Sequence, residues 1–183
     1  IDETPKRVIA GDSQWVDVLL ALDIPTVGHT TDAYVGKTFP WQDGLAEDSV
    51  NFGALSSWPI DDVIDLEPDL ILGTWTIPNE ATYESLEAIA PTIGPLTDRA
   101  VDRWEDMARL AGQIFDKEDE AQALIDSVDE RIDGIAERLP GLEGKTFVLA
   151  NYVEGDSLVI VADPEDGANS LFARLGLQLP DEI

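Results

Sequence analysis

The chain has 183 residues, and 44% of them are hydrophobic, which is enough to bury one substantial core or two small lobes. It carries 38 acidic and 11 basic residues, a formal net charge of −27, so its field repels nucleic acids and anionic membrane surfaces. The absence of cysteine excludes disulfides, zinc–thiolate sites and cysteine nucleophiles, and no apolar run approaches the roughly 20 residues of a membrane span.

The first hundred residues alternate short apolar runs with stretches whose apolar residues recur at helical spacing. The predicted strands are 7–12, 24–30, 69–73 and 91–96, and the predicted helices are about 13–22, 58–67 and 79–90. Asp12 or Ser13 is suited to cap the first helix. This alternation is typical of a parallel sheet covered by helices, in which ligands bind beyond the carboxyl ends of the strands.

The segment 31–57 is polar, contains Gly and Pro, and shows no steady hydrophobic period. A connection of this length is long for a compact domain, and long loops tend to carry function. We therefore expect 31–57 to be a functional loop.

After residue 100, two apolar stripes at helical spacing predict longer helices. One stripe runs from Trp104 to Phe115, and the other runs from Ala121 to Leu139, where the letters LPG end it. The second helix is about 20 residues long, hence near 30 Å. Its stripe is too short for a coiled coil and has no mate, so we expect a rigid connector between two lobes.

The last part of the chain returns to strands. The runs 145–153 and 157–162 flank the turn Glu154–Asp156 and predict a hairpin. Asn169 is suited to cap a final helix, which Gly176 ends. Because one hairpin and one helix do not readily form an independent core, we expect only the beginning of a second lobe here.

The common signatures of catalysis, G-x-G-x-x-G, the Walker loop and G-x-S-x-G, are missing from the sequence. A Ser-His-Asp triad would have to use the single histidine, His29, and no serine lies in a recognisable nucleophile turn. A metal site usually needs several His and carboxylate ligands, for which one histidine is poor provision. An ordinary strand-end residue is the favoured interpretation of His29. Asp61 and Asp62 are adjacent within a predicted helix, so they point in different directions and cannot form a catalytic dyad.

Aromatic side chains gather on predicted loops near the carboxyl ends of strands. They are Tyr34, Phe39, Trp41, Trp58 and Trp75. Tryptophan and tyrosine combine a large apolar area with a polar tip, which suits a rigid ligand platform. Each alone is more often a packing residue, but several at one edge favour a ligand-binding surface. Arg99, just beyond the fourth strand, suits an anionic ligand, although a surface ion pair is its commoner use.

The sequence resembles a known family, the solute-binding proteins of ABC importers for ferric siderophores and vitamin B12. The stretches that carry the resemblance are KRVIAGDSQWVDVLLALDIPTVG (6–28), FPW (39–41), IDDVIDLEPDLILGT (60–74), YESLEAIAPTI (83–93) and LPGLEGKTFVLA (139–150). The most specific feature is PDLILG followed by L-x-x-IAPT.

The resemblance implies a two-lobed α/β binding protein that holds its ligand in the cleft between the lobes. We expect a parallel-sheet N-terminal lobe at 1–100, connecting helices at 101–140, and an incomplete C-terminal lobe at 141–183, since the family's second lobe continues further. The resemblance also implies export, and usually lipid anchoring through a Cys upstream of this sequence. A start at Ile1 without Met agrees with removal of a leader. We therefore expect an extracytoplasmic location.

The family commonly places an acidic residue in the helix before PDL, where it meets an arginine of the membrane permease. In this sequence that position falls on Asp61, where Glu is usual. Trp58 and Pro59 stand where the family usually has a small polar turn, so the local loop shape departs from the family pattern.

We therefore predict a monomeric binding protein, not an enzyme, that captures an iron–siderophore chelate and has no cofactor or metal site of its own. The predicted ligand contacts are Tyr34, Trp41, Trp58, Trp75, Arg99 and Tyr152. The net charge of −27 favours a neutral or cationic hydroxamate chelate over an anionic catecholate. Haem or a corrinoid is the alternative ligand. The alternative classes are an α/β enzyme domain that uses His29 and a surface protein that holds a partner through its aromatic edge.

Overall fold

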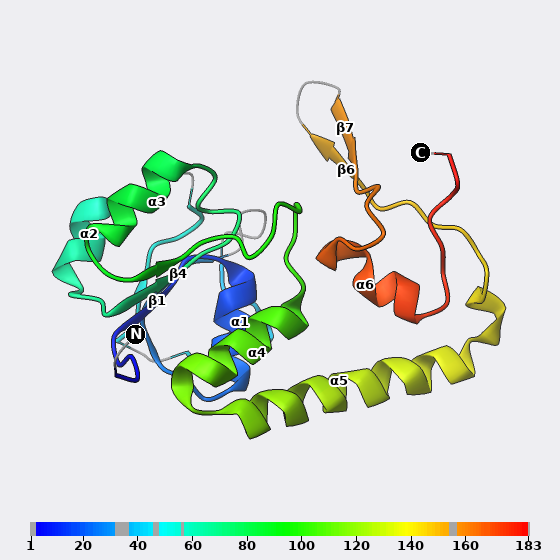
Figure 1. The fold of residues 1–183 in the computed structure, drawn as a ribbon, viewed down its shortest axis with the longest axis horizontal. Helices are drawn as coiled ribbons and strands as arrows, with labels where there is room; N and C mark the ends of the chain where they lie inside the picture. The colour runs from blue at the N-terminus through cyan, green and yellow to red at the C-terminus, as the bar shows by residue number, and fades with distance from the viewer. Residues whose placement is uncertain (1–2, 32–36, 46–47, 56, 154–156, 183) are drawn as a thin grey trace.

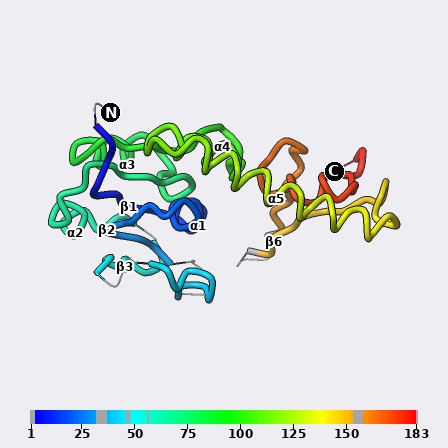
Figure 2. The backbone as a smooth tube through the Cα atoms, turned by 90° about the horizontal axis from the view of Figure 1, so that it is seen from below, coloured from blue at the N-terminus to red at the C-terminus, as the bar shows by residue number. Residues whose placement is uncertain are grey.

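The computed structural model describes residues 3–31, 37–45, 48–55, 57–153 and 157–182. Figure 1 shows a sheet with its helices at one end of the molecule and a hairpin with a short helix at the other. The long helix α5 (Glu118–Arg138) runs between the two ends, and Figure 2 shows the same arrangement from below. We call residues 3–115 the sheet region and residues 140–182 the hairpin region.

The described strands of the sheet region are all parallel to their neighbours. They are β1 (Val8–Ala10), β2 (Thr26–His29), β3 (Val50–Asn51), β4 (Leu70–Leu72) and β5 (Thr92–Ile93), in the order β3-β2-β1-β4-β5. The chain builds outward from β1 to β3 and then returns to the other side of β1 for β4 and β5. The carboxyl ends of β1 and β4 therefore flank the switch point of the topology, where sheets of this kind bind ligands.

Helices cover both faces of the sheet. They are α1 (Ser13–Ala21) and α4 (Trp104–Phe115) on one face, and α2 (Ile60–Asp65) and α3 (Glu80–Glu87) on the other. Successive strand residues point to opposite faces, so Val8 and Ala10 pack toward α1 and α4 while Ile9 packs toward α2 and α3. Burial on both faces explains why β1 and β4 are continuous apolar runs rather than alternating ones.

The segment 31–57 contains more regular structure than its sequence predicts. The 3₁₀-helix η1 (Pro40–Gln42) lies within it, and β3 pairs with β2 so that Val50 lies opposite Gly28. The prediction of a loop throughout is therefore wrong at β3. This strand has only two residues, both exposed, so the hydrophobic pattern carries no sign of it.

Both helices predicted after residue 100 are confirmed. Met107 and Ala108 place α4 in the same core as α1, and Ala121 at the start of α5 joins that core. Three acidic residues occupy the first turn of α5, where they complement the positive end of the helix dipole. Further along α5, Asp129 and Asp133 pair with Arg174, which anchors the hairpin region to this helix.

The hairpin region contains the predicted hairpin and a terminal helix. Its elements are η2 (Pro140–Leu142), β6 (Ala150–Val153), β7 (Ser157–Ile160) and α6 (Gly167–Arg174), with β6 and β7 antiparallel. The prediction that Asn169 caps the last helix is wrong. Asp166 is the cap, since its carboxylate accepts a hydrogen bond from the Ala168 amide at 2.9 Å. Asn169 instead lies in the first turn and donates to the carbonyls of Val161 and Asp163.

Candidate ligand-binding site

Asp12 follows β1 and connects the elements that meet at the switch point. Its side chain is fully buried, and its Oδ1 caps α1 by accepting a hydrogen bond from the Trp15 amide at 3.0 Å. Its Oδ2 accepts hydrogen bonds from the amide and the hydroxyl of Thr74, at 2.6 and 2.8 Å. Burial raises the pKa of Asp12, and the hydrogen bonds from Trp15 and Thr74 oppose that rise. One carboxylate thus ties the start of α1 to the loop that follows β4.

Trp58 packs against Gly11, which follows β1. A Cβ atom at residue 11 would lie 2.3 Å from the Trp58 ring, so only glycine leaves room for the indole here. The indole N–H donates a hydrogen bond to the carbonyl of Thr76 at 2.8 Å, and only 8% of Trp58 is exposed. Trp58 is therefore largely buried beneath the switch point and is not an exposed aromatic surface.

These contacts explain why Trp75, the large apolar residue just past β4, faces solvent. Asp12 holds Thr74, the residue before it, and Trp58 holds the carbonyl of Thr76, the residue after it. With its neighbours held inward on both sides, the Trp75 side chain stays 43% exposed. The tertiary structure thus fixes this tryptophan in an outward position.

Trp58 and Trp75 share a hollow of about 280 Å³. Its lining consists of Leu55, Ser57, Trp58, Trp75, Thr76, Pro78, Asn79 and Thr82. The hydroxyl of Thr76 is buried and has no hydrogen-bond partner among the described residues. The hollow therefore combines the aromatic surface of two tryptophans with polar lining residues such as Ser57, Asn79 and Thr82, which is the usual composition of a ligand pocket.

Trp41 forms a separate aromatic surface next to α1. Its ring stacks on Phe39 with centroids 4.4 Å apart and planes 5° from parallel, and 63% of Trp41 is exposed. Its indole N–H donates to the carboxylate of Asp17 at 3.3 Å, and Gln42 donates to the same group at 2.7 Å. Trp41 is thus a well-supported platform, although it does not line the hollow that contains Trp58 and Trp75.

The other predicted contacts lie in different surroundings. Arg99 donates from Nε to Asp163 at 3.0 Å and pairs with Glu165 through Nη2, so both ends of its guanidinium face carboxylates. Tyr152 lies in β6 and is 68% exposed. Tyr34 lies outside the described residues. Asp61 is exposed in the first turn of α2, as a docking residue requires.

His29 has the surroundings of a structural residue. It is buried at the end of β2, and its Nδ1 lies 2.9 Å from the hydroxyl of Ser49. Desolvation lowers the pKa of His29, which favours the neutral imidazole. In the part of the chain that the structure describes, no group of three or more His, Asp or Glu side chains is placed to hold a metal ion. The described helices likewise include none with the length and apolarity needed to cross a bilayer.

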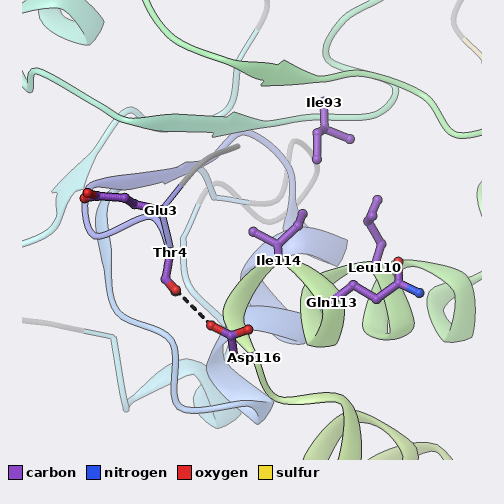
Figure 3. Close-up of a pocket in the computed structure, with 7 residues that line it drawn as sticks. All are labelled: Glu3, Thr4, Ile93, Leu110, Gln113, Ile114 and Asp116. Carbon is purple, nitrogen blue, oxygen red and sulfur yellow. Dashed lines mark hydrogen bonds between the residues drawn. The ribbon is translucent and has the colours of Figure 1, made fainter.

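A second hollow, of about 460 Å³, lies at the end of α4 (Figure 3). Its lining consists of Glu3, Thr4, Ile93, Leu110, Gln113, Ile114 and Asp116. The hydroxyl of Thr4 donates to Asp116 at 2.9 Å and closes one side. None of the aromatic candidates that the structure describes lines this hollow. We place the candidate site at the switch point because the loops after β1 and β4 meet there.

The sequence interpretation missed the second role of Asp12. Its position after a strand and before a helix indicates a cap, and the structure confirms the cap. Its bonds to Thr74 join residues 62 positions apart, and no local pattern indicates such a partner. The one available signal is the pair Gly11-Asp12, because glycine after a strand often marks a close approach of another group.

The family model described as periplasmic binding protein matches residues 8–182. The chain belongs to this family. Its members are solute-binding proteins rather than enzymes, and the α/β fold with a parallel sheet that the sequence predicts is confirmed.

Individual relatives cover nearly all of this chain. "Probable siderophore-binding lipoprotein YfiY" of Bacillus subtilis (strain 168) is 28% identical over an alignment of 185 residues, which covers 100% of this chain and 54% of the relative. The solved periplasmic solute binding protein of Mycobacterium smegmatis is 26% identical, with a TM-score of 0.77 over 98% of this chain and 65% of its own.

The iron uptake ABC transporter substrate-binding protein PiaA of Streptococcus pneumoniae superimposes with a TM-score of 0.81 at 24% identity, over 99% of this chain and 65% of PiaA. At this identity the likeness to PiaA shows the fold alone. The chain spans about half of the length of YfiY, 54%.

Proposed function

We propose that the chain is the ligand-binding part of an extracytoplasmic solute-binding protein that captures an iron–siderophore chelate and delivers it to an ABC permease. The observation that carries the proposal is Trp75, held outward at the switch point beside Trp58 in a shared hollow. Membership of the periplasmic binding protein family and the similarity to YfiY, which is named as a probable siderophore-binding lipoprotein, support the same ligand class.

The charge distribution favours a chelate that is neutral or cationic, such as a ferric hydroxamate. The net charge is −27, and both ends of the Arg99 guanidinium face carboxylates. To pair with Arg99, an anionic catecholate would have to break the ion pairs of Arg99 with Asp163 and Glu165. Without such a pair, its negative charge would be repelled by the acidic surface. Haem or a corrinoid is the second ligand class, because the aromatic surfaces of Trp41 and Trp75 suit a flat macrocycle as well.

We further propose that the ligand lies between two walls, residues 1–100 and residues 141–183, which residues 101–140 connect. Tyr152 would then contact the ligand from the second wall, and Tyr34 and Trp41 would contact it from the first. We propose that the binding protein is monomeric, anchored through a lipidated Cys upstream of this sequence, and docks on the permease through Asp61.

Intrinsic tryptophan fluorescence tests the proposal. The ligands are a cationic and a neutral ferric trihydroxamate, a ferric tricatecholate, ferric citrate, haem and cobalamin. Free N-acetyl-tryptophanamide is titrated in parallel, because coloured ligands also absorb the emitted light. Gallium(III) chelates of the same siderophores, which are colourless, provide calorimetric confirmation without that artefact.

We expect saturable binding of at least one hydroxamate chelate, and a smaller fluorescence change in Trp75→Phe than in Trp41→Phe. Tight binding of haem or cobalamin alone would support the second ligand class. Failure of all six ligands to bind would refute small-molecule capture and favour a surface interaction protein.

A further inference from the structure

The sheet region and the hairpin region meet at a second place, besides their connection through α5. The loop 96–102, which precedes α4, contacts the turn 163–167, which leads into α6. The Gly167 amide donates a hydrogen bond to the Val101 carbonyl at 2.9 Å. The Asp166 Oδ2 accepts hydrogen bonds from the amides of Ala100 and Val101 at 3.0 and 3.3 Å. We call this contact the 101–167 junction.

The junction is closely packed. A Cβ atom on Gly167 would lie 2.4 Å from the carbonyl oxygen of Asp102 and 2.8 Å from that of Val101. These contacts involve backbone atoms, which cannot rotate away as a side chain can. Asp166 is buried, so its carboxylate depends on the two amides and the Ala168 amide to replace water. The junction therefore keeps the sheet region and the hairpin region at a fixed distance from each other.

Each side of the junction is fastened to its own region. Within the loop, the buried carboxylate of Asp102 accepts hydrogen bonds from the Leu96 amide at 2.9 Å and the Thr97 hydroxyl at 2.7 Å. Gln14 of α1 donates to the Asp102 carbonyl at 3.3 Å. Within the turn, Asn169 holds the Val161 and Asp163 carbonyls. A displacement at the junction would therefore move whole regions rather than loose loops.

Arg99 completes the junction on its exposed side through Asp163 and Glu165. The Glu165 amide and the Arg99 guanidinium both lower the pKa of Asp163, which favours the charged form of this carboxylate. Exposed ion pairs contribute little on their own, so we assign the main constraint to the backbone contacts at Asp166 and Gly167.

We infer that the 101–167 junction sets the relative position of the two regions, and that Asp166 and Gly167 are positioning residues for ligand binding. A single helix can bend along its length, so α5 alone would not fix the relative position of the two regions (Figure 1). The junction connects them at a second place and restricts that bending. If the two regions are already fixed relative to each other before the ligand binds, binding does not have to include the entropy cost of ordering them. The consequence for ligand affinity rests on the proposed function, while the consequence for geometry does not.

Two substitutions distinguish a role in positioning the two regions from a role limited to the stability of α6. Gly167→Ala places a better helix former at the first residue of α6, so a local role predicts unchanged or improved stability of that helix. Asp166→Asn keeps a good helix cap but replaces an acceptor oxygen by an amide group that faces two N–H donors. Gly141→Ala is the matched control, because a Cβ there meets nothing within 4 Å.

The geometric test measures the distance between the two regions in the full chain. Because the sequence has no Cys, Glu84→Cys in α3 and Leu158→Cys in β7 provide two unique sites for spin labels, and both side chains are exposed. Pulsed electron paramagnetic resonance should give a narrow distance distribution in the unsubstituted background and in Gly141→Ala. Gly167→Ala and Asp166→Asn should each shift or broaden it.

Circular dichroism verifies folding of each variant, and Asp166→Asn alone decides the question if Gly167→Ala does not fold. Unchanged distributions in the folded variants would overturn the inference. In the binding arm, we expect the affinity of Asp166→Asn for a ferric trihydroxamate to fall about tenfold or more. Unchanged affinity despite a broadened distribution would refute the positioning role. If the unsubstituted chain binds no chelate, the proposed function fails while the distance measurement still decides the junction.

Discussion

Asp12 and Thr74 lie 62 residues apart in the chain and are joined through one carboxylate oxygen, which accepts both the amide and the hydroxyl of Thr74 at 2.6 and 2.8 Å. This pair connects the two strands that flank the switch point, β1 and β4. It also fixes the residue before Trp75, so the exposure of that tryptophan depends on a buried acid rather than on the loop sequence alone.

Asp12→Asn should destabilise the fold. The amide nitrogen of Asn cannot accept the hydrogen bonds that Thr74 or Trp15 donates, so at least one buried N–H loses its partner. Such a loss costs about 1–3 kcal/mol. Urea unfolding measures it, with Asp23→Asn as the control, because Asp23 is exposed and the substitution removes the same charge. Equal stability of the two variants would contradict the role of Asp12.

The cost of Asp12→Asn should also depend on pH. Because burial raises the folded-state pKa of Asp12 above 3.8, the stability linked to its protonated form is fully present below pH 3.8 and is lost as the pH rises through the raised pKa. The difference in unfolding free energy between the unsubstituted chain and Asp12→Asn should therefore shrink as the pH rises above 3.8. Urea unfolding of both proteins at a series of pH values tests this prediction. A difference in unfolding free energy that grows with pH would contradict it.

Trp75→Ala and Trp58→Ala should have opposite effects. Trp75 is 43% exposed, so its removal should reduce chelate affinity tenfold or more while it costs about 1 kcal/mol of stability or less. Trp58 is buried against Gly11, so its truncation should cost about 3–5 kcal/mol of stability. Thermal unfolding and chelate titration of both variants decide the matter. A steep loss of stability in Trp75→Ala with unchanged binding would assign that residue to the core.

Asp61→Arg should leave chelate binding intact and abolish uptake in cells that carry the whole protein. Asp61 is exposed at the start of α2, and a reversed charge would repel a cationic residue of the permease. Asp65→Arg, at the other end of the same helix, is the control for a general charge effect. Equal loss of uptake in both variants would speak against a specific contact, and loss of chelate affinity in purified Asp61→Arg would assign Asp61 to the cleft.

The sequence by itself determined the succession of strands and helices and placed the cap of α1 at Asp12 or Ser13, because periodicity and capping depend on residues within a few positions of one another. It also determined the family, since the motifs around PDLILG occur in the family's order. Local patterns were insufficient at β3, which has two exposed residues, and at α6, where the cap is Asp166 and not the predicted Asn169.

Only the tertiary structure decided which of the loop tryptophans is buried. The sequence assigns Trp58 and Trp75 to the same predicted aromatic edge, but Trp58 packs against Gly11 and bonds to Thr76, whereas Trp75 is held between two anchored neighbours. The structure likewise directed Arg99 toward the turn before α6. The physical reason is the same in each case: the burial of a side chain and the partner of a charge depend on segments that are distant in the chain and meet only when the strands assemble in their final order.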